Sequence, residues 1–172
     1  MGTPRILENV ILIVAICSID DDRMELVCRE LHAGYGDIQF RSDIFSFTHT
    51  NYYAKEMGKE LFKRFIAFKN PIDPTEIVDI KLFCNHLEDQ FRLKSNRSVN
   101  IDPGYIEIPK LVLATTKNFS HRIYLGKGIY GDVQLYWRGG RFMSNPWTYA
   151  DYKQNLATTF FSQVRTYLLG GV

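Results

Sequence analysis

The sequence predicts an α+β fold with a ferredoxin-like core. In that core a β-α-β-β-α-β unit forms an antiparallel sheet with two helices on one face, extended here by a C-terminal β-hairpin and helix. Three observations predict it: a β-branched apolar run at residues 10–17, a sharply marked helix start at Asp73, and the order in which strand-like and helix-like patterns follow each other. The 172 residues, 45% of them hydrophobic, suffice for a single domain, residues 1–172, with a sizeable core.

The first three elements read as strand, helix and strand. Residues 10–17 are apolar at every position, which is typical of a strand covered on both faces. Ser18 or Asp20 then caps a helix that ends near Gly34. Its apolar residues recur at helical spacing: Met24, Val27, Cys28 and Leu31. Residues 38–47 alternate in the manner of a second strand.

In the middle of the chain some elements have clear sequence signals and others do not. Residues 48–60 read as a connecting loop with a turn at Gly58. Residues 61–69 fit either a helix or a strand, and their Phe and Ile content favours a strand. Asp73 begins a helix, because an N-cap Asp followed by Pro and, two residues later, Glu is typical of a helix start. That helix carries an apolar stripe: Ile77, Ile80, Cys84, Leu87 and Phe91.

The last third of the chain adds a hairpin and a helix to the six-element core. Residues 128–143 alternate around a Gly-Gly pair at positions 139–140, which suits a hairpin turn and puts Gln134 and Leu135 on opposite sides. Thr148 and Asp151 are spaced to cap a C-terminal helix. These two elements are expected to extend the sheet or to cover its open face.

Charge is distributed unevenly along the chain. The formal net charge is +2. Residues 91–141 hold nine Lys or Arg against three acids, a net charge of +6, and the remaining residues hold twelve against sixteen, a net charge of −4. A basic face built from the later half would favour an anionic ligand, and a simple solvated surface is the alternative.

Cysteine usage predicts a reduced, cytoplasmic protein. The three cysteines are odd in number, far apart and on apolar positions: Cys17, Cys28 and Cys84. This pattern indicates buried thiols and neither disulfides nor a zinc site. The apolar run at residues 10–17 is too short to span a membrane, and no signal peptide is expected.

Polar residues are densest between positions 100 and 124, in turn-rich sequence of the kind that forms binding or catalytic sites. His121 is the candidate catalytic residue for proton transfer, with Asp102 to orient it or to accept the proton. Lys117 and Arg122 are the candidate groups for holding an anion. Two neighbours complete the predicted ligand-binding set: Asn100 and Tyr105.

A plainer interpretation of the same stretch stays open. Asp102 and Asn100 can simply cap a turn at Pro103-Gly104, which is a common use of these side chains. His121 is then a surface residue at the end of a strand.

The sequence contains none of the common motifs for nucleotide binding, zinc binding or covalent catalysis. No phosphate-binding loop, dinucleotide fingerprint or serine nucleophile elbow occurs, and no two His have the spacing of a zinc site. The sequence therefore predicts no metal and no cofactor. Sheet aromatics such as Tyr124 and Tyr136 could stack on RNA bases, but the signature of RNA-binding sheets is missing, so a nucleic-acid partner is not expected.

Several longer strings carry a family resemblance. They are Thr50-x-Tyr52-Tyr53 with Glu56-Met57-Gly58, Lys81-Leu82 with Asn85 and Glu88, Asn100-x-Asp102-Pro103-Gly104-Tyr105, Leu113-Ala114-Thr115-Thr116-Lys117, His121-Arg122-Ile123-Tyr124-Leu125 with Gly128-Ile129-Tyr130, and Trp147-Thr148-Tyr149 with Asp151-Tyr152. On these strings the chain resembles, over nearly its whole length, an uncharacterised bacterial family, the domain of unknown function family 4416. The resemblance implies that the polar strings belong to one shared feature, and it implies no particular chemistry. Ala150 stands where the family pattern has Pro, and either residue suits a first helical turn.

Two functions follow as expectations. The first is a small cytoplasmic domain that binds an anionic small molecule, phosphorylated or nucleotide-like, and that acts as an enzyme if His121 and Asp102 form a proton-transfer pair. The alternative is a non-enzymatic interaction module, which pairs with copies of itself in a homo-oligomer or contacts RNA. The sequence separates the two poorly, because the deciding fact is whether the candidate residues converge on one pocket.

Overall fold

The computed structural model describes residues 2–3, 9–48, 54–58 and 60–171. Its strands are β1 (Val10–Ser18), β2 (Ile38–Arg41), β3 (Phe45–Ser46), β4 (Phe62–Ile72), β5 (Val99–Glu107), β6 (Lys110–Thr115), β7 (Arg122–Gly126), β8 (Ile129–Arg138) and β9 (Arg141–Ser144). Its helices are α1 (Asp21–Tyr35), α2 (Ala54–Met57), α3 (Ile77–Gln90) and α4 (Asn155–Leu168), with 3-10 turns η1 (Pro74–Glu76) and η2 (Ala150–Lys153). Within this part of the chain the fold combines helices with one large antiparallel sheet.

The sheet is continuous, with strands in the order β2-β4-β1-β5-β6-β8-β7, while β3 pairs with β4 and β9 with β8. The pairings are antiparallel. β1 lies between β4 and β5 and is buried at each of its nine positions. Its apolar sequence follows from this central place, because both of its faces pack against other layers.

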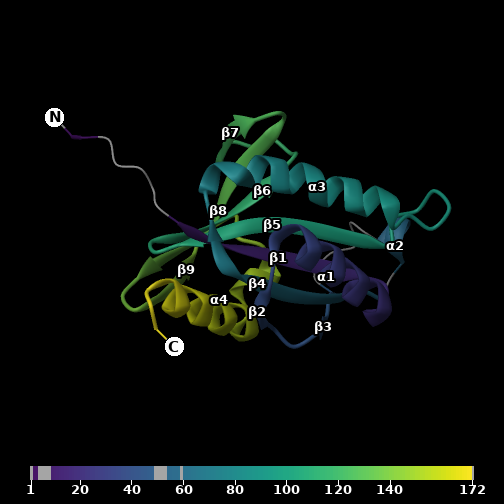
Figure 1. Cartoon of the computed structure of the whole chain (residues 1–172), viewed down its shortest axis with the longest axis horizontal. Coiled ribbons are helices and arrows are strands. Elements are labelled where there is room, and N and C mark those ends of the chain that lie inside the picture. Colours follow the sequence, from purple (N-terminus) through teal and green to yellow (C-terminus); the bar gives the residue numbers. More distant parts are fainter. Residues whose placement is uncertain (1, 4–8, 49–53, 59, 172) are drawn as a thin grey trace.

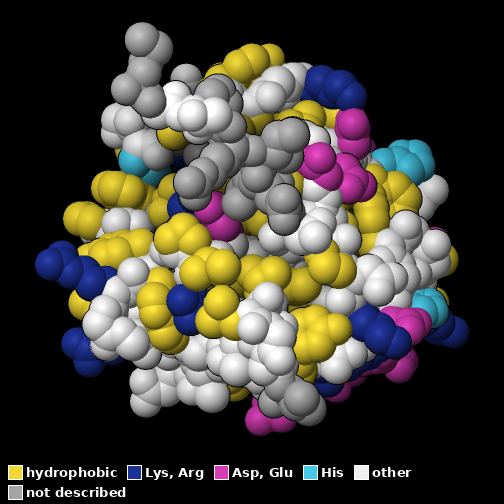
Figure 2. Space-filling view, turned by 60° about the vertical axis from the view of Figure 1, so that its left-hand side comes forward, with side chains coloured by type: hydrophobic (Ala, Val, Ile, Leu, Met, Phe, Trp, Pro, Cys, Tyr) yellow, Lys and Arg dark blue, Asp and Glu magenta, His cyan; other side chains and the backbone are white. Residues whose placement is uncertain are grey.

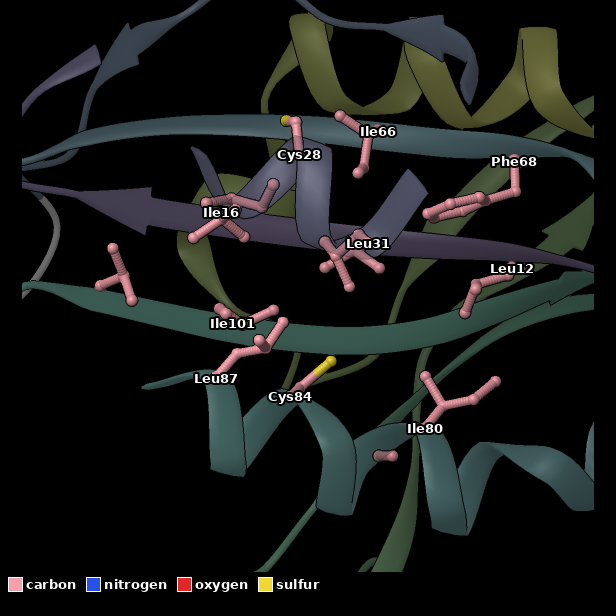
Figure 3. Packing of buried hydrophobic residues seen from close by; sticks show 14 of the residues in the cluster. Leu12, Ile16, Cys28, Leu31, Ile66, Phe68, Ile80, Cys84, Leu87 and Ile101 are labelled. Atoms are coloured by element: carbon pink, nitrogen blue, oxygen red, sulfur yellow. The ribbon is translucent and has the colours of Figure 1, made fainter. Parts of the chain in front are cut away.

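Helices α1 and α3 cover one face of the sheet (Figures 1 and 3). The Asp20 carboxylate accepts the backbone N–H of Arg23 at 2.8 Å and so caps α1. The core under these helices includes Leu12 and Ile16 of β1, Leu31 of α1, and Ile80 of α3. Both predicted helical stripes therefore point at the sheet.

Helix α4 covers the opposite face, on the other side of the central strands from α3 (Figure 1). Phe65 lies at the centre of this second core, with its ring 4.9 Å from Phe161 and 5.2 Å from Tyr152. Such edge-on and tilted aromatic contacts add to the stabilisation from area burial. The predicted C-terminal extension is thus the cover of the second face.

Several predicted elements are confirmed. β4 (Phe62–Ile72) takes in residues 62–69 of the stretch that had fitted both a helix and a strand. Asp73 caps the turn before α3, with its carboxylate accepting the Thr75 N–H at 2.8 Å. Residues 38–47 instead form two short strands, because the N–H and hydroxyl of Ser42 bond to Phe65 of β4 at the break. The expected loop at residues 48–60 contains the short α2, and residues 49–53 and 59 lie outside the described residues.

The predicted turn at Pro103-Gly104 is wrong, because both residues lie inside β5. Gly104 is needed there for a close approach: a Cβ atom would stand 2.3 Å from the carbonyl oxygen of Val112. Pro103 lies two residues after Ile101, so the backbone groups of both residues point to the same side of β5. On that side the N–H and C=O of Ile101 bond to side chains of α3 and not to β1. Pro103 therefore costs the β1 ladder no hydrogen bond.

The predicted hairpin β8–β9 is confirmed, but the helix start after it is not. A register shift between β6 and β8 breaks the alternation, so that Gln134 and Leu135, expected on opposite sides, are both buried. The Thr148 hydroxyl donates to the Gln134 carbonyl and accepts from the Asn145 N–H at 2.8 Å. Thr148 is therefore not a helix cap, and α4 begins only at Asn155.

Figure 2 shows one face on which hydrophobic side chains gather in a band, with Lys and Arg side chains scattered around it. The three cysteines are buried and free, as the sequence predicted. Burial raises the pKa of the Cys17 and Cys84 thiols to about 12. In the described part of the chain, no helix has the length and apolar character needed to cross a membrane.

Candidate functional site

The site begins with a split in the sheet. β5 pairs with β1 from Val99 to Ile106. β6 pairs with β5 only over the second half of that length, from Gly104 to Glu107. The outer edge of the first half of β5 is consequently not covered by β6, and its backbone polar groups need other partners.

Two charged side chains of α3 supply those partners. The Ile101 N–H donates to Glu88 Oε1 at 2.7 Å, and Lys81 Nζ donates to the Ile101 carbonyl at 2.9 Å. Lys81 and Glu88 are seven residues apart, so two helical turns bring them to the same face of α3. These two side chains make the hydrogen bonds to Ile101 that a neighbouring strand would otherwise make. The end of β6 can therefore diverge from β5 at this point.

The split also holds a buried charge network. Asp102 Oδ1 lies 3.2 Å from Lys81 Nζ, and its Oδ2 accepts from the Asn100 amide at 2.6 Å. Arg97 continues the network, with Nη1 3.1 Å from Glu88. Because each charge has a partner of opposite sign, the network offsets part of the cost of removing these groups from water.

The network sets the protonation of its members. Burial opposes ionisation of Asp102, but Lys81, Lys63 and two hydrogen bonds outweigh it, so the pKa of this carboxyl lies below its usual range. Burial likewise opposes the charge on Lys81, but Asp102 and Glu88 overcome it and its pKa is raised. For Glu88 burial prevails over Lys81, the Ile101 N–H and Arg97, and the pKa of Glu88 is raised.

A second buried ion pair lies across the site. Lys63 of β4 and Asp151 of η2 approach to 2.6 Å, and their side chains are only 6% and 4% exposed. The Lys63 ammonium also lies 4.8 Å from the centre of the Phe47 ring and 5.3 Å from that of Tyr152. These rings favour a cation at their faces and so hold the charged end of Lys63 in place.

The segment before η2 is anchored to β8. Asn145 Nδ2 and Trp147 Nε1 both donate to the Val133 carbonyl at 2.9 Å. The Tyr149 N–H donates to the Gln134 side chain at 2.9 Å. These bonds satisfy polar groups at the register shift of β8, and they fix Tyr149 and the following Asp151 beside the split.

The split opens into a cavity of about 490 Å³. Fourteen residues line it: Phe47, Lys63, Lys81, Asn85, Glu88, Arg97, Asn100, Asp102, Thr115, Thr116, Lys117, Tyr149, Ala150 and Asp151. Four of them are basic and three are acidic. The volume is in the range of small-molecule sites, and convergent polar groups with shifted pKa values are typical of such sites.

The structure brings some of the predicted site residues together. Asn100, Asp102 and Lys117 line the cavity. Arg122 reaches its wall, donating to the Tyr149 hydroxyl at 3.0 Å and to the Lys117 carbonyl at 2.9 Å. Burial raises the pKa of Tyr149, and Arg122 opposes the rise.

His121 and Tyr105 lie elsewhere. His121 Nε2 is 3.5 Å from the Asp132 carboxylate, which also accepts from Arg122 Nε at 2.8 Å. The His121 ring stacks on Trp147, with centroids 4.7 Å apart and an interplanar angle of 14°. The carboxylate partner of His121 is therefore Asp132, whereas Asp102 bonds to Lys81 and Asn100. Tyr105 is half-buried against the core under α1 and α3.

Eleven of the fourteen lining residues were not among the predicted site residues, and six of these eleven are polar or charged residues of β4, α3 and the segment around η2: Lys63, Lys81, Asn85, Glu88, Tyr149 and Asp151. A signal for two of them existed. Lys81 follows Ile77 by four residues, and Glu88 follows Cys84 by four residues. At this helical spacing both charged side chains lie on the apolar face of α3, where an apolar residue is expected. A charge at such a position needs a buried partner, and here the partner is the edge of β5.

A family model matches residues 8–167, and it is described as a domain of unknown function (DUF4416). The chain belongs to this family. The match spans the whole site, from β1 to α4, and the resemblance seen in the sequence strings is thereby confirmed. No curated protein and no solved structure matches the chain. Among the residues that the structure describes, no three His, Cys, Asp or Glu side chains group so as to hold a metal ion.

Proposed function

We propose that this DUF4416 protein binds a small anionic molecule, such as a phosphate ester, in the cavity between β5 and the end of β6. One observation carries the proposal: side chains from β4, α3, β5, β6 and η2 converge on a single cavity in which four of seven charged groups are basic. Buried ionisable groups with shifted pKa values that converge on an open cavity are typical of ligand sites.

The end of β6 is the part of the wall best suited to the anion. Lys117 follows Thr115 and Thr116, two hydroxyl-bearing residues that also line the cavity. Arg122 donates to the Lys117 carbonyl and to the Tyr149 hydroxyl, and so ties both sides of the opening together. Ammonium and hydroxyl donors on a braced turn are the groups that bind phosphate oxygens.

The proposal concerns binding. It includes no proton transfer between His121 and Asp102, because the two side chains have different partners. The cytoplasmic location expected from the sequence is part of the same proposal and is supported by the three buried free thiols. We also propose that β2-β4-β1-β5 with α1 and α3 is the ferredoxin-like unit expected from the sequence, since its order and antiparallel pairing suit that unit.

Thermal denaturation in the presence of glucose 6-phosphate or inorganic phosphate tests the proposal. A ligand at one hundred times its Kd stabilises the native state by about 2.7 kcal/mol, which raises the Tm of a chain of this size by about 5–10 °C. The rise is expected in the wild type and in Arg141→Ala, a control at the exposed β8–β9 turn. It should be strongly reduced in Lys117→Ala. If no anion raises the Tm beyond the effect of sodium chloride, or if both variants respond alike, the proposal is wrong.

A second candidate function rests on the outermost strand. β7 ends the sheet, and three consecutive apolar residues on it are exposed: Ile123 (70%), Tyr124 (60%) and Leu125 (42%). An exposed apolar edge is suited to pairing with another strand, here β7 of a second copy about a two-fold axis. Light scattering of the wild type and of Ile123→Lys decides it: a dimer converted to a monomer supports the pairing, and a wild-type monomer refutes it.

A further inference from the structure

We propose that the ligand of the cavity is a phosphorylated sugar, with its phosphate toward Lys117 and its hydroxyl groups toward Asp102 and Asn85. This inference rests on the proposed function, because it names the class of ligand for the same cavity.

Asp102 is one of the acids that line the cavity. The Asp102 side chain is 27% exposed, and each of its oxygens already accepts one bond, from Lys81 at 3.2 Å and from Asn100 at 2.6 Å. An ionised carboxylate accepts further hydrogen bonds, donates none, and repels a second anion. The part of the ligand nearest Asp102 must therefore be a donor, and the phosphate must lie away from it.

The surroundings of Asp102 favour a hydroxyl donor over an ammonium donor. The ammonium groups of Lys81 and Lys63 both act on the negative charge of Asp102 and hold its pKa down. A ligand ammonium placed beside Asp102 would meet these two like charges. A neutral hydroxyl donates to the carboxylate without that repulsion, so hydroxyl groups fit this end of the cavity better.

Asn85 is a further polar residue of the cavity wall. Its side chain is half-buried on α3, lines the cavity, and makes no hydrogen bond to another described residue. An amide offers two donors and an acceptor, and a hydroxyl is likewise both a donor and an acceptor. A sugar that carries several hydroxyl groups can therefore satisfy Asn85 and Asp102 together, which a bare phosphate cannot.

Isothermal titration calorimetry on the wild type with three matched ligands tests the inference. Glucose 6-phosphate carries hydroxyl groups, hexyl phosphate carries none, and glucosamine 6-phosphate replaces one hydroxyl with an ammonium. Leaving a site's polar group unpaired costs enough to change affinity about tenfold. Glucose 6-phosphate is expected to bind at least about tenfold more tightly than either of the others.

Two variants test whether residues of the cavity wall cause the preference for glucose 6-phosphate. Asn85→Ala is expected to weaken glucose 6-phosphate several-fold and to leave hexyl phosphate unchanged, while Gln90→Ala, an exposed change on the same helix, alters neither. Asp102→Asn should reduce the preference for glucose 6-phosphate over hexyl phosphate. If that variant fails to fold, Asn85→Ala still decides the matter.

The outcomes distinguish this inference from the proposed function. If glucose 6-phosphate and hexyl phosphate bind equally, and Lys117→Ala weakens both, then the anion site stands and the sugar is wrong. Tighter binding of glucosamine 6-phosphate overturns the choice of a hydroxyl over an ammonium. If none of the three ligands binds, the proposed function itself fails.

Discussion

Lys81 joins α3 to β5 through two bonds, so its loss should be costly. In Lys81→Met the aliphatic volume is largely kept, but the Ile101 carbonyl loses its donor at 2.9 Å and Asp102 loses its cation at 3.2 Å. Removing one member of a buried pair costs about 3–5 kcal/mol. Because Asp102 is 27% exposed and keeps Asn100, the lower end applies, and we expect a loss of about 3 kcal/mol.

Urea denaturation at pH 7 measures this loss as the change in the free energy of unfolding. Lys69→Met is the matched control, because Lys69 is 54% exposed and 3.7 Å from Asp37, and exposed pairs contribute only about 0–1 kcal/mol. A loss below about 1 kcal/mol in Lys81→Met would show that the edge of β5 does not depend on this side chain.

The pH dependence gives the same prediction a second test. The pKa of Asp102 is lowered from 3.8 in the folded protein, so its ion pair stabilises the fold fully above 3.8, and this stabilisation disappears as the pH falls through the lowered pKa. Without Lys81 the buried Asp102 takes up a proton at higher pH. The difference in stability between wild type and Lys81→Met should therefore narrow as the pH falls from 7 toward 4. A constant difference would contradict the pairing.

Three further changes test other parts of the structure. Glu88→Gln keeps an acceptor for the Ile101 N–H and should cost about 1 kcal/mol in urea denaturation, whereas Glu88→Ala should cost about 2–3 kcal/mol; equal losses would argue against the hydrogen bond. Thr148→Val keeps the shape of the side chain but removes the hydroxyl that bonds to the Asn145 N–H and to the Gln134 carbonyl. It should cost about 2 kcal/mol, and a neutral result would remove Thr148 from the anchoring of η2. Because the pKa values of Cys17 and Cys84 are raised to about 12, native protein at pH 8 should not react with Ellman's reagent at these thiols, and urea should release three thiols per chain; rapid reaction without urea would contradict their burial.

The elements that could be predicted are those marked by neighbouring residues. Asp73 caps its own turn through Thr75 and Glu76, so the helix start was readable locally. Pro103-Gly104 was misread because the usual use of this pair is a turn. Its role in β5 depends on Val112, which approaches Gly104 from the next strand, and on α3, which covers the unpaired edge.

The candidate site was predictable as a region and not as a set of contacts. Asn100, Asp102 and Lys117 do share the cavity. The partner of His121 could not be read from the sequence, because Asp132 faces it only through the pairing of β7 with β8. Lys63 and Asp151 are 88 positions apart in the chain, and only the packing of η2 over β4 makes them an ion pair.

Backbone amide NMR can locate a small anionic ligand bound in the cavity between β5 and β6. Titration with glucose 6-phosphate should shift amide signals in a saturable way along the wall that faces the ligand: Asn100, Thr115, Thr116, Lys117, Ala150 and Asp151. Signals of the β8–β9 turn at Arg141 should stay in place. Saturating shifts confined to other parts of the chain, or no shifts at millimolar ligand, would contradict binding in this cavity.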